Sequence, residues 1–131
     1  MHSTIFIKNA TILLEDGNVI QGGLFLAEGK INAIYKELGC PLDLPEHVQI
    51  IDATHLTAIP GFIDGHIHGA NGADTMDATG EALDAMASFL PKEGTTSFLA
   101  TTITQAPEHI DNALQNIASY KNKPAYAEMI G

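Results

Sequence analysis

The 131-residue chain is 45% apolar and carries sixteen acidic side chains against six basic ones, which gives a net charge of −10. This apolar content excludes a disordered chain, and the acidity argues against nucleic acid or an anionic membrane surface as a partner. The single cysteine, Cys40, excludes an internal disulfide and favours a reducing compartment. Because we find no signal peptide and no apolar run long enough to span a bilayer, we expect a cytoplasmic protein.

The N-terminal segment, residues 1–58, is predicted to be rich in β-strands. Its short runs of Ile, Leu and Phe are separated by residue pairs that favour tight hairpin turns. These pairs are Asp16–Gly17, Gly22–Gly23 and Glu28–Gly29. Residues 38–47 contain two prolines and no periodicity, so a loop is expected there. Two further short strands are predicted over residues 48–53 and 56–59.

The pattern changes after Pro60 to an alternation of strands and amphipathic helices. The predicted strand, helix, strand, helix and strand cover residues 61–69, 79–94, 95–104, 107–122 and 125–131. Thr79 is a candidate N-cap of the first helix, and Gly94 is a candidate stop. This alternation predicts a parallel sheet. Since a barrel of eight such units needs about 250 residues, we expect these two and a half units to begin a longer fold.

Two histidines, His66 and His68, lie one residue apart in the first strand of this region. Alternate strand residues face the same side, so the two Cα atoms are expected roughly 6–7 Å apart on one face. Both imidazoles could then bind one metal ion at about 2.0–2.1 Å. An H-x-H pair also occurs by chance among surface or packed histidines. An otherwise apolar strand, however, has little other reason to carry two histidines on one side.

Several neighbours of the pair are weaker candidates. Asp64 shares the face of His66 and could orient a metal ligand or form a structural hydrogen bond at the strand start. Gly69 and Asn71 belong to a loop of small residues that would let a substrate approach closely. Asp74 and Asp77 precede a helix, where acidic residues more often serve as caps than as substrate contacts.

Other polar residues of the chain are expected to have structural or surface roles. Three threonines at the end of the second strand are expected mainly to form sheet, with pocket lining as the alternative: Thr101, Thr102 and Thr104. Three other histidines are expected at the surface: His47, His55 and His109. Lys121 and Lys123 are expected to complement the dipole at the end of the second helix.

The run "PGFIDGHIHG", preceded by "EGKINAI" and "IIDATHLTAI", resembles the metal-dependent amidohydrolase superfamily. The longer pattern "PGFIDGHIHGANGADTMDA" followed by "EGTTSFLATTIT" resembles the N-acetylglucosamine-6-phosphate deacetylases within that superfamily. The resemblance implies the N-terminal part of a (β/α)8 TIM barrel, an α/β fold, preceded by half of a small β-sandwich domain. It places residues 1–58 in the sandwich segment and residues 59–131 in the barrel.

The resemblance also implies a reaction. A divalent metal, Zn or Fe as one or two ions, would be held in part by His66 and His68. Its bound water would attack the acetamide of N-acetylglucosamine 6-phosphate, a phosphosugar, and release acetate and glucosamine 6-phosphate. The family's remaining ligands, proton-shuttling aspartate and phosphate-binding groups are implied to follow Gly131. No catalytic residue is therefore expected within the chain, which alone should be inactive, and the intact protein is expected to be a homodimer.

Two other hypotheses stay open at this point. The protein could be a different amidohydrolase, such as a dihydroorotase-like or dipeptidase-like member, although the run "HGANGAD" favours a deacetylase. Alternatively, the 131 residues could be a non-catalytic remnant of a truncated gene.

Overall fold

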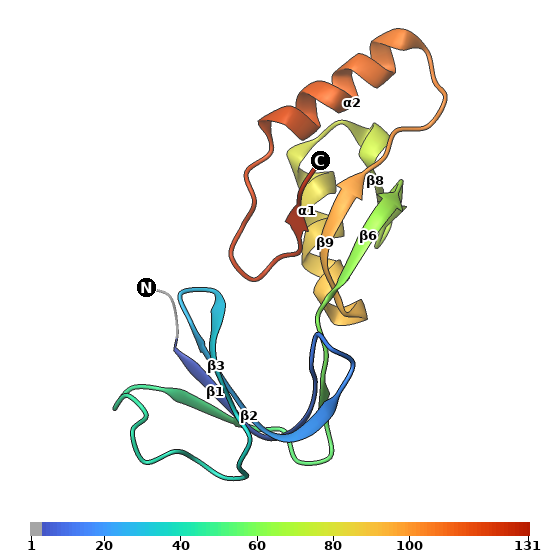
Figure 1. The fold of residues 1–131 in the computed structure, drawn as a ribbon. Helices are drawn as coiled ribbons and strands as arrows, with labels where there is room; N and C mark the ends of the chain where they lie inside the picture. Colours follow the sequence, from blue (N-terminus) through green and yellow to red (C-terminus); the bar gives the residue numbers. More distant parts are fainter. Residues whose placement is uncertain (1–3) are drawn as a thin grey trace. The chain divides into compact units, whose positions relative to one another are not determined.

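A computed structural model describes residues 4–131 of the protein (Figure 1). By their contacts the residues divide into two compact units, Met1–Pro60 and Gly61–Gly131. The first unit is built from β-strands, and the second combines strands with helices, so the chain has a mixed α/β fold. Neither helix of residues 4–131 combines the length and the apolar character that a bilayer crossing needs.

The first unit is a five-stranded sheet. Its strands are β1 (Ile5–Leu13), β2 (Val19–Ala27), β3 (Lys30–Tyr35), β4 (Gln49–Asp52) and β5 (Thr57–Ala58). The order is β3-β2-β1-β4, and β5 also pairs with β1. The first three strands are antiparallel, whereas β4 and β5 run parallel to β1. A small core of buried side chains forms on the sheet: Ala10, Ile12, Leu24 and Ala53.

Two of the three predicted turns connect these strands. Asp16–Gly17 lies between β1 and β2, where the Gly17 amide donates to the Leu14 carbonyl at 3.0 Å. Glu28–Gly29 joins β2 to β3, and both residues have positive φ, 54° and 74°. A two-residue type I′ hairpin requires positive φ at both positions. The local turn signals are therefore confirmed at these two sites.

The prediction of a turn at Gly22–Gly23 is wrong, because both glycines lie inside β2. The reason is the close approach of neighbouring groups. A Cβ at position 22 would lie 1.9 Å from the Tyr35 carbonyl oxygen, and one at position 23 would lie 2.5 Å from Cζ of Phe6. These glycines let β2 pass between a main-chain carbonyl and an aromatic ring.

The second unit is organised around a parallel three-stranded sheet. Its strands, β6 (Phe62–Ile67), β9 (Thr95–Ala100) and β10 (Glu128–Met129), have the order β10-β9-β6. Helices α1 (Gly80–Phe89) and α2 (Pro107–Ser119) connect consecutive strands. Shorter elements follow β6 and α1: β7 (Gly69–Ala70), β8 (Ala73–Asp74), η1 (Thr75–Asp77) and η2 (Leu90–Glu93). The predicted alternation of strand and helix is confirmed.

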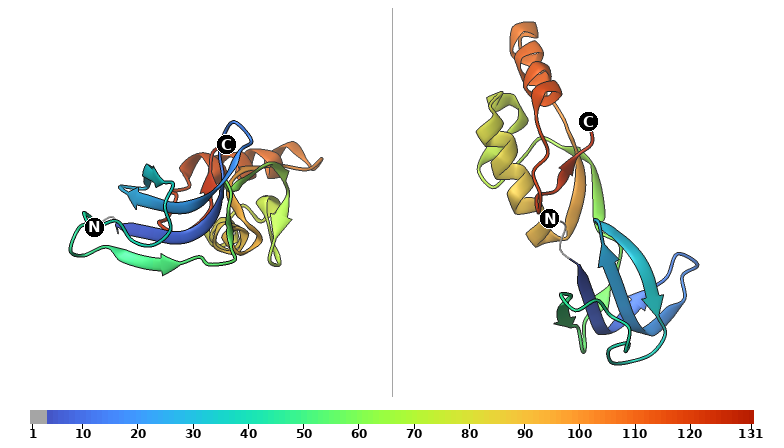
Figure 2. Two further views of the ribbon diagram at one scale, coloured as in Figure 1. Left: turned by 60° about the horizontal axis from the view of Figure 1, so that its bottom comes forward. Right: turned by 90° about the vertical axis from the view of Figure 1, so that its left-hand side faces the viewer.

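Helix α1 lies against one side of the sheet, as the right-hand view of Figure 2 shows. Its buried stripe includes Leu83 and Met86, which cluster with Leu90 of η2, with Phe98 of β9 and with Ala127. Burial of each large apolar side chain contributes about 1.5–3 kcal/mol. The helix begins where the sequence indicates, because Thr79 Oγ1 accepts from the Ala82 amide at 3.2 Å.

Several elements end at other residues than predicted. Gly94 stops the η2 turn in a left-handed conformation, with φ 81°, whereas α1 itself ends at Phe89. The second strand ends at Ala100 rather than at residue 104. Helix α2 ends at Ser119, so Lys123 lies beyond it and forms an ion pair with Asp84 of α1. An ion pair with α1, rather than the helix dipole, therefore accounts for Lys123.

Candidate metal centre

The imidazoles of His66 and His68 converge at the C-terminal end of β6. Their Nε2 atoms are 3.2 Å apart, and the ring centroids are 4.9 Å apart with the ring planes at 89°. His66 is exposed and His68 is half-buried. The strand itself ends at Ile67, one residue before His68 and two before the predicted end. The alternation nevertheless continues for one residue, which puts both histidines on one side.

Ile67, between the two histidines, faces the opposite side. Its side chain packs on the buried cluster formed by α1 and β9, which includes Leu83 and Phe98. Ile67 thus anchors the strand end in the core, while the two histidine rings lie on the other side of the strand.

A local irregularity in the sheet lies at the level of His66. Asp64 pairs with Phe98, and the next pair is Ile67 with Ala100. Strand β6 therefore takes three residue steps, 64 to 67, where β9 takes two, 98 to 100. An extra residue of this kind increases the local twist and redirects a side chain, and such irregularities are common beside functional sites.

The His68 ring is also held from the neighbouring strand. Its Nδ1 lies 3.0 Å from the main-chain carbonyl oxygen of Thr101, the residue that follows β9. The Thr101 amide in turn donates to the Ile67 carbonyl at 2.8 Å. The sequence places Thr101 near the site but gives no sign of this contact, because a main-chain carbonyl is common to every residue type.

Asp64 contacts the main chain of the pair rather than a ring. Its Oδ1 accepts a hydrogen bond from the His66 amide at 3.0 Å. The carboxylate thus fixes the main chain at the residue that carries the first imidazole. Of the two roles considered for Asp64, the contact matches the structural hydrogen bond at the strand.

The residues after His68 form a two-stranded hairpin of β7 and β8. Asn71 and Gly72 make its turn with positive φ, 55° and 78°. At Gly69 a Cβ would lie 2.4 Å from the Ala73 carbonyl oxygen, so the glycine permits this tight pairing. Asp74 and Asp77 form a capping box at η1, in which the Asp74 carboxylate accepts from the Met76 amide at 2.8 Å. The predicted capping role of these two aspartates is confirmed.

The donor set of the His66–His68 pair fits a metal ion. The 3.2 Å between the Nε2 atoms is less than twice a Zn–N bond of about 2.0–2.1 Å, so one ion can bond to both. Within residues 4–131 no third His, Cys, Asp or Glu joins the pair. Catalytic zinc usually has three protein ligands, and the pair supplies two.

The other polar residues considered from the sequence lie outside this pair. Three histidines are exposed, as predicted: His47, His55 and His109. Cys40 is exposed in the loop before β4. The Thr101 and Thr102 residues are half-buried and Thr104 is exposed, all three beyond the end of β9.

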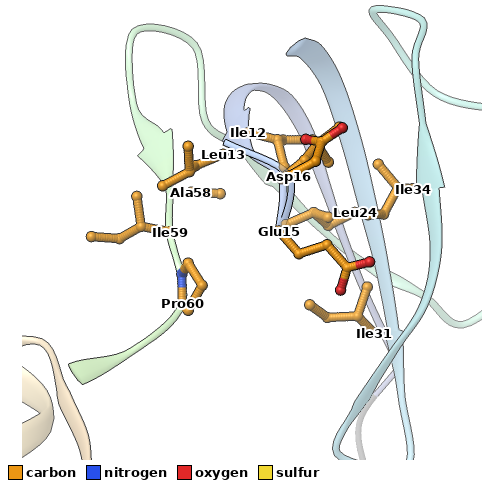
Figure 3. Close-up of a pocket in the computed structure, with 11 residues that line it drawn as sticks. Ile12, Leu13, Glu15, Asp16, Leu24, Ile31, Ile34, Ala58, Ile59 and Pro60 are labelled. Atoms are coloured by element: carbon orange, nitrogen blue, oxygen red, sulfur yellow. The ribbon is translucent and has the colours of Figure 1, made fainter. Parts of the chain in front are cut away.

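The first unit contains an apolar pocket of about 500 Å³. Figure 3 shows side chains of Ile12, Leu24 and Ile59 around it, together with Pro60. Two acidic residues, Glu15 and Asp16, are among those that line it. All residues that line the pocket belong to 12–60, so it includes neither histidine of the pair. It contains no cluster of metal-ligating groups.

Comparison with known proteins identifies the family. The sequence pattern of the amidohydrolase family matches residues 57–125, more than half of the chain. The chain is 43% identical over 121 residues to the N-acetylglucosamine-6-phosphate deacetylase of Bacillus subtilis (strain 168), covering 92% of the chain and 30% of the relative. It is 35% identical over 115 residues to an N-acetylgalactosamine-6-phosphate deacetylase of Escherichia coli O157:H7, covering 88% of the chain and 28% of the relative.

The fold of the chain is also similar to a solved structure of the same kind of enzyme. The crystal structure of the N-acetylglucosamine-6-phosphate deacetylase from Pasteurella multocida matches with a TM-score of 0.75 and 31% identity, covering 92% of the chain and 32% of that protein. The chain thus spans about a third of the length of the proteins that it matches. The match of the family pattern includes both histidines of the converging pair, and the chain belongs to the amidohydrolase family.

Proposed function

We propose that the full-length gene product hydrolyses the acetamide of N-acetylglucosamine 6-phosphate to glucosamine 6-phosphate and acetate. The observation that carries the proposal is the convergence of His66 and His68, whose Nε2 atoms lie 3.2 Å apart at the end of a parallel strand. The likeness to deacetylases of N-acetylated sugar phosphates indicates the substrate. The substrate is a small molecule, and neither nucleic acid nor a membrane is part of the proposal.

The architecture that we propose for the full-length protein is a TIM barrel preceded in the sequence by half of a small β-sandwich. In the second unit, three parallel strands are adjacent in chain order and a helix follows each of the first two. This order fits a barrel, and it also occurs within one half of a doubly wound sheet. The match to the amidohydrolase family favours the barrel. We assign residues 59–131 to the first two and a half βα units, and residues 1–58 to half of the sandwich.

In this proposal His66 and His68 hold a divalent ion through their Nε2 atoms. When bound, such an ion supplies Lewis acidity, which lowers the pKa of water and polarises an amide carbonyl. The chain's own residues position the two ligands: Asp64 fixes the His66 amide, and the Thr101 carbonyl contacts the His68 ring. Further ligands and the catalytic acid–base group would come from residues outside this sequence.

The finer parts of the proposal follow from the resemblance. They are Zn or Fe as the metal, one or two ions per site, a homodimer and a cytoplasmic location. Imidazole ligands suit both Zn and Fe, so the ligand type does not choose between them. Gly69 and Asn71 lie on the hairpin beside the pair, and we place them close to the substrate.

The test is an acetate-release assay on the full-length gene product, combined with metal analysis of the same preparation. We expect acetate from N-acetylglucosamine 6-phosphate, metal bound in proportion to protein, and loss of activity when a chelator removes the metal. Slow or absent release from unphosphorylated N-acetylglucosamine would support a phosphosugar substrate. A metal-loaded protein that releases no acetate from the phosphosugar would overturn the proposal.

A second candidate substrate is N-acetylgalactosamine 6-phosphate, the epimer at C4. The 35% identity to a deacetylase named for that compound favours its inclusion in the assay. We expect the glucose-type substrate to react with the higher kcat/KM, because the relative named for it has the higher identity, 43%. The opposite ratio would reassign the substrate but not the reaction.

A further inference from the structure

We propose that the main-chain carbonyl of Thr101 is a positioning group for the metal centre: it holds His68 in the Nδ1–H tautomer and so keeps Nε2 free to bind the metal. This inference rests on the proposed function, since it assumes the metal site of the deacetylase. It extends that proposal to the second strand of the sheet, whose end then becomes part of the site.

The tautomer follows from the chemistry of the contact. A carbonyl oxygen only accepts hydrogen bonds, so the 3.0 Å contact between Thr101 O and His68 Nδ1 requires a proton on Nδ1. A neutral imidazole carries one proton, and its Nε2 then has a free lone pair. Metal-bound histidines commonly donate their other ring N–H to a carboxylate or a backbone carbonyl, which fixes the ring orientation.

The carbonyl is itself held in place by the strands. The Thr101 amide donates to the Ile67 carbonyl at 2.8 Å, so Thr101 is tied to the residue just before His68. The His68 carbonyl accepts from the Thr75 amide at 2.7 Å. The ring and the backbone of His68 are therefore both fixed, and its half-buried position limits competition from water.

His66 is held less firmly. Its ring is exposed, and within residues 4–131 its one hydrogen-bond partner is Nε2 of His68 at 3.2 Å. Because His68 Nε2 has the free lone pair, His66 Nε2 must carry the proton of this contact when no metal is bound. The two histidines thus have opposite tautomers, and on metal binding only His66 changes. Its proton leaves Nε2 and one from solvent occupies Nδ1.

The first experiment observes the tautomers directly. The full-length gene product is labelled with 15N-histidine, stripped of metal with a chelator, and studied by long-range 1H–15N NMR at a pH where both rings are neutral. We expect a pyrrole-type Nδ1 and a pyridine-type Nε2 for His68, and the reverse for His66. Assignment uses His66→Gln and His68→Gln variants. A His68 ring protonated on Nε2, or averaging between tautomers, would overturn the inference.

The second experiment weakens the carbonyl without changing a side chain. Replacing the peptide bond between Thr101 and Thr102 by an ester makes the Thr101 carbonyl a poorer acceptor. We expect about a tenfold loss of metal affinity, the low end of the ~10–100-fold range for outer partners of metal ligands, measured by competition with a chelator. The matched control is an ester between Thr102 and Ile103, which should leave the affinity unchanged.

A Thr101→Ala variant separates main chain from side chain. It keeps the carbonyl and removes the hydroxyl, which donates to the Leu99 carbonyl at 3.2 Å. We expect the tautomer of His68 and the metal affinity to be unchanged. Equal affinity of both ester forms, or a loss in Thr101→Ala as large as in the 101–102 ester, would count against the main-chain carbonyl as the positioning group.

These outcomes are distinguishable from failure of the proposed function. If the protein releases no acetate but the 101–102 ester lowers metal affinity, the deacetylase proposal fails while the positioning role stands. If it releases acetate and His68 is protonated on Nε2, the positioning role fails while the deacetylase proposal stands.

Discussion

At the scale of single residues, the candidate centre depends on where two nitrogen atoms lie. The Nε2 atoms of His66 and His68 are brought to 3.2 Å by a strand end that is anchored on the opposite side by Ile67. The His68 ring is held by the Thr101 carbonyl, and the main chain of His66 is held by Asp64. The arrangement is therefore organised before any ion binds.

Removing either imidazole should remove metal as well as activity. For His66→Ala and His68→Ala in the full-length protein, we expect metal affinity to fall by more than ~100-fold, beyond the range typical of outer partners. Metal analysis and acetate release are measured on the same samples. His109→Ala, which removes an exposed histidine at the start of α2, is the control and should retain both. Lost turnover with unchanged metal stoichiometry would contradict a ligand role.

The glycines of β2 give a second prediction at this scale. A methyl group at position 22 would lie 1.9 Å from the Tyr35 carbonyl oxygen, a main-chain atom that cannot rotate away. We expect Gly22→Ala to lower the free energy of unfolding by about 2–3 kcal/mol, the upper part of the range for overpacking. Denaturant unfolding measures the change.

Gly80→Ala is the matched control, and we expect it to raise the free energy of unfolding. A methyl group there meets nothing within 4 Å, at the first position of α1. Since alanine favours helix over glycine, we expect a gain of about 0.5 kcal/mol. Equal effects of the two variants would show that space around the glycine does not decide the outcome at position 22.

At the scale of elements, α1 is joined to the segment after α2 by a small polar cluster. Asp84 of α1 pairs with Lys123, and its other oxygen accepts from the Tyr120 hydroxyl at 3.0 Å. The hydrogen bond from Lys123 holds the pKa of the Asp84 carboxyl below its ordinary value, and Asp84 raises the pKa of Lys123. Burial, and then Asp84, raise the pKa of Tyr120 to about 12.

These directions predict a dependence of stability on pH. A carboxyl whose pKa is lower in the folded state stabilises the fold above its ordinary pKa of about 3.9, and this contribution disappears as pH falls through the lowered value. Asp84→Asn should therefore lower the thermal midpoint slightly at pH 7, and the difference from the unsubstituted protein should shrink towards zero in acid. The effect is small because both side chains are partly exposed, 28% for Asp84 and 50% for Lys123.

Asp111→Asn is the control for this pH series. Asp111 is exposed on α2, and within residues 4–131 it forms no ion pair. Its substitution should leave the pH dependence of the thermal midpoint unchanged. If the difference in thermal midpoint between Asp84→Asn and the unsubstituted protein stayed constant from neutral to acid pH, the ion-pair explanation would be contradicted.

The elements also show what the sequence can predict. Thr79 and the apolar stripe of α1 are local signals, and the structure confirms the helix that they indicate. The Gly22–Gly23 pair has the composition of a turn, but its reason is a carbonyl on β3 and a ring on β1, which no local pattern contains. The same distinction holds for the candidate metal centre. The two-residue period of a strand predicts that the two histidines share a face. The contact with the Thr101 carbonyl depends on strand pairing, which the local sequence does not contain.

At the scale of the whole molecule, charge and exposed apolar surface have opposite effects on association. The net charge of −10 favours solubility. Against it, β6 and β10 are the two edges of the parallel sheet, and Phe62, Ile63 and Ile130 are 60%, 67% and 51% exposed. Charge repulsion is screened beyond about 8–10 Å at physiological salt. Hydrogen bonding at strand edges and burial of apolar side chains occur at direct contact and are not screened by salt. We therefore expect these attractions to outweigh the charge repulsion and to cause association.

The resulting prediction concerns residues 1–131 produced on their own. We expect this polypeptide to be catalytically inactive and to form oligomers or aggregates, detected by size-exclusion chromatography with light scattering, and more so as salt increases. Ile63→Lys puts a charge on the β6 edge and should reduce association. Leu42→Lys, at a fully exposed loop position, adds the same charge away from a strand edge and should have little effect. A monomeric product that melts cooperatively, or equal effects of the two lysines, would show that the open edges of the parallel sheet do not drive association.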